Sequence, residues 1–226
     1  MIKLNDVKKI YGTGDNATHA LNGINLEIKD SEILGIMGTS GSGKSTLINI
    51  IGGMDTVTSG EYFFDDIDVS GLKLSKLHNF RKNNISFVFQ NFALMNHYTV
   101  YENVEVPLKA KGIKRSERKK IIREKLEMLG IAELERKLPT QISGGQQQRC
   151  AIARALAMDN SVLLADEPTG ALDSKNGKEI MDIFEDIKKL GKTIIIVTHD
   201  IEIAKRCERI IRIEDGIIEE KQSKLQ

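Results

Sequence analysis

One short stretch, residues 38–46, limits what this chain can fold into more than any other. It reads Gly-Thr-Ser-Gly-Ser-Gly-Lys-Ser-Thr and follows an apolar run, Ile33 to Met37, that suits a buried parallel strand. The apolar residues from Leu47 to Ile51 suit the start of a helix. A strand, a glycine-rich turn and a helix in this order form the context in which a G-x-x-x-x-G-K-[ST] sequence makes a phosphate-binding loop. The stretch therefore predicts an α/β fold with a nucleotide site.

Each residue type in this loop suits the binding of a polyphosphate. Gly38, Gly41 and Gly43 let the backbone turn so that successive N–H groups point at the phosphates. Lys44 reaches the β and γ phosphates, and Ser45 offers a hydroxyl to Mg²⁺. A flexible linker would explain the glycines but not a Lys-Ser pair at this offset. The residues predicted to contact the nucleotide here are Gly38, Ser40, Gly41, Ser42, Gly43, Lys44, Ser45 and Thr46.

The composition is that of an ordinary globular chain. Its 226 residues, 40% hydrophobic and 29% charged, can bury a core as one domain. The net charge of +1 offers no electrostatic case for nucleic-acid binding. No run of about 18 apolar residues and no signal-peptide pattern occurs, which predicts a cytoplasmic location. Cys150 and Cys207 lie far apart and fit no metal spacing, so we expect two reduced thiols.

Three further apolar runs predict parallel strands, and each is followed directly by polar side chains. The carboxyl ends of parallel strands meet at one edge of an α/β sheet, which is where such sheets bind ligands. The polar residues should therefore lie beside the phosphate loop. The runs are residues 85–89, 162–165 and 193–198.

The residues after these runs suit phosphoryl hydrolysis. Asp166 is predicted to hold Mg²⁺ together with Ser45 and Gln90, and Glu167 to polarise the attacking water. His199 is predicted to contact the γ-phosphate, although a lone histidine after a strand is more often structural. The residues predicted to be catalytic are Glu167, His199, Gln90 and Lys44.

The remaining segments predict a small antiparallel sheet and several helices. Alternating residues at 2–7, 20–28 and 62–64 indicate the sheet, with Tyr11 as an adenine-stacking aromatic or a turn residue. The mixed stretch 91–108, which ends near Pro107, is either an exposed surface for another protein or a loop that packs on its own core. The other predicted elements are a helix from a Ser116 cap to Leu129, a helix from 174 to 190, a last strand at 209–213 and a frayed tail at 222–226.

A further helix should begin at Ser143, with Ile152, Ala155 and Leu156 buried. Its first turn contains Gly144 and Gly145, and each glycine costs about 1 kcal/mol against alanine in a helix. Exposed N–H groups at a helix N-terminus can bind an anion, which would explain the pair.

Taken together, these motifs resemble the ATP-binding-cassette (ABC) ATPase family, and the resemblance covers essentially the whole chain. Its most specific part is the signature Ser143-Gly144-Gly145-Gln146, which ordinary phosphate-loop kinases and GTPases lack. The other matching parts follow the order of the family and are Tyr11, the loop at 38–45, Gln90, Asp166-Glu167, residues 171–173 and His199.

The resemblance implies a phosphate-loop NTPase core with a mainly parallel sheet, a small antiparallel β subdomain and a helical subdomain. It implies ATP and Mg²⁺ as ligands and a dimer of two copies, in which one phosphate loop and the partner's signature enclose each ATP. Tyr11 would then stack on adenine, and Asp173 would lie at the dimer seam. The residues expected at the ATP from the partner's side are Ser143, Gly144, Gly145, Gln146 and Asp173.

A finer resemblance is to the subfamily of macrolide export, lipoprotein release and antimicrobial-peptide resistance. It rests on residues 11–12 with the longer turn to 19–21, and on residues 51–55, 87–90 and 102–108. It implies a separate membrane permease and a position on the inner face of the cell membrane. Ile142, in place of the usual leucine, and Asn96-His97-Tyr98 depart from the pattern of the relatives.

Two other functions remain open from the sequence. One is a soluble cassette ATPase of translation or DNA repair, although no tandem repeat or long heptad pattern occurs. The other is a small-molecule kinase, which would leave the signature unexplained. We predict one domain over 1–226, with core and β subdomain at 1–90 and 157–226 and a helical subdomain at about 91–156.

Overall fold

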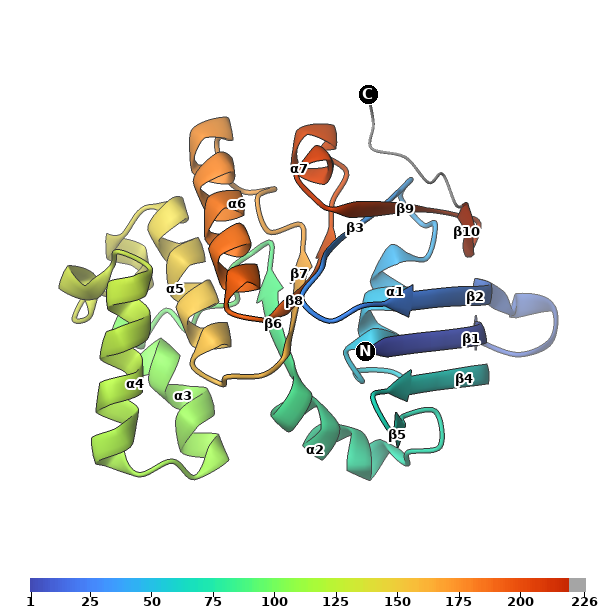
Figure 1. Cartoon of the computed structure of the whole chain (residues 1–226), viewed down its shortest axis with the longest axis horizontal. Helices are drawn as coiled ribbons and strands as arrows, with labels where there is room; N and C mark the ends of the chain where they lie inside the picture. The colour runs from blue at the N-terminus through green and yellow to red at the C-terminus, as the bar shows by residue number, and fades with distance from the viewer. Residues whose placement is uncertain (220–226) are drawn as a thin grey trace.

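The fold is built around a six-stranded sheet (Figure 1). The computed structural model describes residues 1–219, so the tail predicted for 222–226 lies outside the described residues. All neighbouring strands are parallel except β10, which pairs antiparallel with β9. Strand β10 was not predicted from the sequence, because it is short and mostly exposed. From edge to edge the strands are β10 (Ile217–Glu219), β9 (Arg209–Glu214), β3 (Ile33–Gly38), β8 (Thr193–Val197), β7 (Val162–Asp166) and β6 (Ile85–Phe89).

The predicted antiparallel sheet is confirmed and has four strands. Leu4 pairs with Leu26 and Tyr62, and all three side chains are buried, so one face of this sheet is apolar. In Figure 1 the sheet lies to the right of β6, β7 and β8 and below β9. The strands, in spatial order, are β2 (Thr18–Ile28), β1 (Ile2–Tyr11), β4 (Ser59–Phe64) and β5 (Ile67–Asp68).

Two hydrophobic cores lie on the two faces of the parallel sheet. Ile195 and Val197 of β8 belong to the core shared with α1 (Lys44–Ile51) and the antiparallel sheet. Ile194 and Ile196 belong to the core on the other face. Residues 194–197 of this strand are all apolar because both faces of the strand are covered. The helices around the sheet also include α2 (Leu74–Asn84), α6 (Ser174–Lys189) and α7 (Ile201–Lys205).

The predicted helical subdomain contains three helices at the left of Figure 1, and its boundaries at 91–156 stay a prediction. The stretch with Pro107 forms a helix, which the mixed sequence did not indicate. A capping box between Thr99 and Glu102 starts it, and Val104 and Leu108 bury its apolar face. The helices are α3 (Val100–Lys111), α4 (Arg115–Met128) and α5 (Gly144–Leu156), with short 3-10 turns at Gly14–Asn16, Ala132–Leu134 and Pro139–Gln141.

The predicted start of α4 is wrong. The N-cap residue is Lys114, not Ser116, and Lys114 has no side-chain cap bond. Ser116 lies inside the first turn, where its side chain is exposed. Ile122, Leu126 and Leu129 form a buried apolar stripe along this segment. The helix is therefore held by this stripe rather than by a cap.

Candidate functional site

Four parallel strands carry the predicted catalytic residues to one edge of the sheet. Ile36 of β3 pairs with Val197 of β8, Val197 pairs with Asp166 of β7, and Asp166 pairs with Phe89 of β6. The residue that follows each of these strand ends therefore emerges on the same side. The residues gathered in this way are the phosphate loop, His199, Glu167 and Gln90. We call this side of the sheet the catalytic edge, after the roles predicted for these residues.

The phosphate loop is a cradle that only glycine permits at two positions. A Cβ on Gly38 would lie 2.2 Å from the Ile213 carbonyl oxygen. Gly43 has φ 105°, and a Cβ there would lie 2.5 Å from the Ala20 carbonyl oxygen. Lys44 Nζ donates to the carbonyl oxygens of Gly38 (2.9 Å) and Thr39 (2.6 Å), so the ammonium is held over the loop.

Two observations show that this loop fits a phosphate. The Ser42 hydroxyl is buried and has no hydrogen-bond partner among residues 1–219, and such a group costs free energy unless a ligand or water satisfies it. The N-terminus of α1, at Lys44, adds the partial positive charge of a helix dipole. Ser40, Ser45 and Gly41 are exposed around the same turn. The loop therefore presents donors to an anion from several sides.

The carboxylates after β7 have different surroundings. Burial and then the neighbouring Glu167 raise the pKa of Asp166, while Lys44 partly offsets them. A carboxylate in this environment gains free energy from a bound cation, and with the Ser45 hydroxyl and the Gln90 amide oxygen it offers the hard oxygen ligands that Mg²⁺ prefers. The structure thus fits the predicted metal ligands, whose role stays a prediction.

Glu167 is held in a strained and specific position. Its φ of 49° is rare for a residue with a side chain, and its N–H donates to the Val197 carbonyl oxygen (2.9 Å). Its Oε1 lies 2.8 Å from Nδ1 of His199, whose side chain is 73% exposed. Gln90 approaches the segment that follows Glu167, and its Nε2 lies only 2.9 Å from where a Cβ on Gly170 would be. Glu167 is therefore aimed by the backbone and by His199 together.

Tyr11 is oriented by a carboxylate to which the sequence analysis assigned no role at the site. The Tyr11 hydroxyl donates to Asp55 Oδ2 (2.7 Å), and Lys9 Nζ donates to Asp55 Oδ1 (2.6 Å). Burial and the bond to Asp55 raise the pKa of Tyr11, and the nearby Thr46 of the phosphate loop partly offsets them. The ring is 41% exposed, so a face is open to a planar ligand. Only the motif at 51–55 marked Asp55 beforehand.

The signature residues begin α5 as predicted. The Ser143 hydroxyl accepts from the Gln146 N–H, and the Gln146 side chain accepts from the Ser143 N–H, which forms a capping box. A Cβ on Gly145 would lie 2.5 Å from Asn176 Oδ1, so this glycine allows close packing against α6. Asp173 caps α6 by accepting from the Asn176 N–H (2.8 Å).

The structure does not bring the signature to the phosphate loop of the same chain. In Figure 1, α5 and α1 lie on opposite sides of the parallel strands. A buried side chain that the sequence did not indicate links α5 to the catalytic edge: Gln148 Nε2 donates to the Pro168 carbonyl oxygen (2.6 Å), one residue after Glu167. Helix α5 thus connects the signature turn to the catalytic edge, although the signature turn lies away from the phosphate loop of the same chain.

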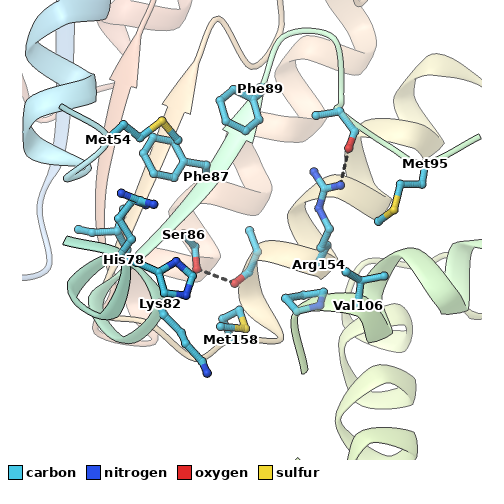
Figure 2. Close-up of a pocket in the computed structure, with 15 residues that line it drawn as sticks. Met54, His78, Lys82, Ser86, Phe87, Phe89, Met95, Val106, Arg154 and Met158 are labelled. Atoms are coloured by element: carbon cyan, nitrogen blue, oxygen red, sulfur yellow. Dashed lines mark hydrogen bonds between the residues drawn. The ribbon is translucent and has the colours of Figure 1, made fainter. Parts of the chain in front are cut away.

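A groove of about 530 Å³ separates the core from the helical part (Figure 2). Phe87 and Phe89 of β6 stack at a centroid distance of 5.5 Å along it, and Met54 and Met95 line it from the two sides. Arg154 of α5 donates to the carbonyl oxygens of Phe92 and Ala93, which both have positive φ. The segment after Gln90 therefore runs directly from the catalytic edge into an apolar groove.

The comparison with protein families agrees with these motifs. The family model described as ABC transporter matches residues 21–170, from β2 through the phosphate loop and signature to the segment after Glu167. This chain belongs to the ABC transporter family. The cassette contains the parts that the sequence predicted for this family, in the same order.

Known relatives indicate the subfamily to which the cassette is most similar. It is 48% identical to an uncharacterized ABC transporter ATP-binding protein, MJ0796 of Methanocaldococcus jannaschii, over 97% of this chain and 95% of that protein. It is 45% identical to the macrolide export ATP-binding/permease protein MacB of Escherichia coli K12, over 96% of this chain. The cassette spans only 34% of the length of MacB. The predicted resemblance to the macrolide-export subfamily is confirmed.

Solved structures confirm the fold. The cassette superposes with a TM-score of 0.89 on a dimeric, post-hydrolysis MJ0796 bound to ADP and Pi, at 45% identity over the whole of this chain and 99% of the other. It superposes with a TM-score of 0.88 on CbiO1 of Clostridium perfringens, part of an ABC transporter complex, at 33% identity over 97% of this chain and 86% of that chain. Among residues 1–219, none of the helices has the length and hydrophobicity needed to cross a membrane.

Proposed function

We propose that this cassette is the ATP-hydrolysing subunit of a membrane transporter and that it works as a dimer. The observation that carries the proposal is the placement of the signature turn away from the phosphate loop of its own chain. The first turn of any helix leaves N–H groups without intrahelical partners. The Ser143 side chain accepts one of them, from Gln146, and Gly144 is only partly buried, so its N–H remains open to an anion. A second copy supplies the missing anion, the γ-phosphate of its own bound ATP. The dimeric relative with ADP and Pi supports this arrangement.

The residues at the catalytic edge divide the work of hydrolysis. Lys44 and the loop N–H groups bind the β and γ phosphates, and Tyr11, oriented by Asp55, stacks on adenine. Ser45, Asp166 and Gln90 would hold Mg²⁺, which neutralises phosphate charge when it is bound. Glu167 orients the attacking water and accepts its proton, while His199, held by Glu167, contacts the γ-phosphate.

Hydrolysis is coupled to a transmembrane permease through the groove. Phe92 and Ala93 hold strained backbone conformations directly after Gln90, and Arg154 fixes their carbonyl oxygens. A change at Gln90 is therefore passed to a wall of the groove rather than lost in a flexible loop. An apolar groove between two parts of a domain suits the insertion of a short permease segment. Such a partner places the cassette on the inner face of the membrane.

Mixing two inactive variants tests the dimer. Lys44→Ala removes the phosphate contact, and Gly144→Asp adds a negative charge at the signature, where the nearest atom to a Cβ is 3.5 Å away. Each variant alone should be inactive. In mixed dimers one of the two sites combines an intact loop with an intact signature, so equal amounts should recover about a quarter of wild-type hydrolysis.

The same mixture distinguishes the alternatives. If each chain uses its own signature, mixing restores nothing and the proposal of a shared site is wrong. Circular dichroism of Gly144→Asp serves as the folding control, since an acidic residue in the first turn favours the helix. Phosphate release is the measurement in both cases.

A charge introduced into the groove tests whether a permease segment docks there. Met54 is 42% exposed in the groove wall, so Met54→Glu should leave the fold and the basal hydrolysis intact while it prevents an apolar segment from docking. We expect the multispanning protein that co-purifies with wild type from native membranes in mild detergent to be lost. Met128→Glu, at a 40% exposed position on α4, is the matched control. Recovery of wild type with ribosomal or DNA-repair proteins instead would favour a soluble cassette ATPase.

A further inference from the structure

The chain is nearly neutral overall, but its positive charge is concentrated in two segments. Residues 73–84 contain four Lys and Arg and no acidic residue, and residues 109–125 contain nine Lys and Arg against two Glu. The two segments therefore carry a net charge of +11 within a chain of +1, and the other residues carry −10. By contrast α6 contains four basic and four acidic residues, the mixture typical of a solvent-exposed helix.

The two segments form one surface. Lys82 Nζ at the end of α2 donates to the Ala110 carbonyl oxygen of α3 (2.8 Å), and α4 begins at Arg115 shortly afterwards. In Figure 1, α2 and the turn from α3 to α4 lie along the same lower edge. We call this surface the basic face. It consists of Lys73, Lys76, Lys82, Lys111, Lys114, Arg115, Lys119 and Lys120.

Much of this charge is not neutralised within the protein. Lys109 and Arg118 pair with Glu105, and Arg123 pairs with Glu127. The side chains on the outer side of α4 are exposed and make no ion pair within the part of the chain that the structure describes. These are Lys114, Arg115, Lys119 and Lys120.

The basic face borders the groove. His78 and Lys82 of α2 and Pro107 of α3 line the groove, and Figure 2 shows His78 and Lys82 at one end of it, near Met158. If a permease segment occupies the groove, the surface beside it faces the membrane. Leu74, at the start of α2, is 71% exposed on this face. A basic surface with an apolar side chain at its edge is suited to a lipid interface.

We propose that the basic face rests on the anionic phospholipid headgroups that surround the permease. The inference rests on the proposed function, because the permease turns this face toward the membrane. Clustered Lys and Arg residues beside a membrane protein are attracted to anionic lipid. A single-stranded nucleic acid is a poorer fit, because stacking on bases needs exposed aromatic rings and Phe80, the one aromatic residue in the two segments, is buried.

Sedimentation with vesicles tests the inference without the permease. The isolated chain should bind vesicles of phosphatidylglycerol and phosphatidylcholine in about equal parts, should bind pure phosphatidylcholine weakly, and should be released at about 0.5 M salt. Glutamine at Lys114, Arg115, Lys119 and Lys120 should weaken binding by about 10²- to 10³-fold, since each cation near an anionic surface strengthens binding about fivefold.

A matched variant distinguishes an effect of the basic face from an effect of the overall net charge. It carries glutamine at four other exposed lysines that make no ion pair among residues 1–219, and it should bind vesicles like wild type. These are Lys3, Lys29, Lys175 and Lys178. Equal loss in both variants, equal binding to neutral vesicles, or binding to a short nucleic-acid duplex in place of vesicles would overturn the inference. Any of these results together with co-purification of a permease leaves the proposed function intact.

Discussion

Replacement of Glu167 by glutamine is expected to slow ATP hydrolysis by about 10²- to 10⁴-fold, or roughly 3 to 5 kcal/mol in activation free energy, while ATP still binds. Glutamine has the same size and can keep the bond to His199, so the strained backbone should be unchanged. What is lost is the negative charge that orients water and accepts its proton. Phosphate release under saturating ATP measures the effect, and equilibrium binding of ATP measures what remains.

A distant carboxylate provides the control for this variant. Glu133 lies in the 3-10 turn Ala132–Leu134, where its side chain is exposed, and Glu133→Gln should hydrolyse ATP at the wild-type rate. If binding without turnover also stabilises the dimer, Glu167→Gln should form dimers with ATP in gel filtration. Near-normal turnover of Glu167→Gln would show that another group activates the water.

Replacement of Lys44 by alanine is expected to weaken ATP binding by about 10²- to 10³-fold, because charge-assisted hydrogen bonds to two phosphates are lost. Lys44 Nζ bonds only to carbonyl oxygens of Gly38 and Thr39 in the described residues, so the loop keeps its backbone when the side chain is removed. Calorimetric titration with ATP gives the affinity. The two variants thus differ in kind, since Glu167→Gln changes the rate and Lys44→Ala changes the binding.

The effect of Lys44→Ala should be local. Lys29 is exposed and lies outside the site, so Lys29→Ala should bind ATP like wild type and have the same unfolding temperature. An unchanged ATP affinity in Lys44→Ala would contradict the proposed phosphate contact. A large drop in its unfolding temperature would indicate a structural role for the lysine instead.

Elements with a strong local pattern were predicted well from the sequence. The strands predicted at 162–165 and 193–198 each contain four consecutive apolar residues, and both are found as buried parallel strands. The helix was predicted to begin at Ser143 and to bury one apolar stripe, and the structure shows this start together with a capping box. These signals depend on residues within one or two turns, so neighbouring side chains are enough to specify them.

Elements that depend on distant contacts were not predicted. The helix α3 contains Pro107 and a mixed sequence, but Asn103 holds the preceding loop with bonds to the carbonyl oxygens of Met95 and Tyr98. Asp55 belongs to the motif at 51–55, but only the fold brings it into contact with Tyr11, 44 residues earlier in the chain. The stretch 91–108 contains both an exposed part and a packed part, since Met95 and Tyr98 are exposed while Val100 is buried.

The sequence by itself determined the motifs from which the chemistry of this protein is predicted: a phosphate loop, carboxylates and a histidine after parallel strands, and a glycine-rich helix start that belongs to one family. These are local patterns, because a loop or a cap is specified by residues that adjoin it in the chain. Only the tertiary structure decided which groups meet. The pairing of Glu167 with His199, the separation of the signature from the phosphate loop, and the gathering of two basic segments into one face all depend on packing between segments far apart in sequence.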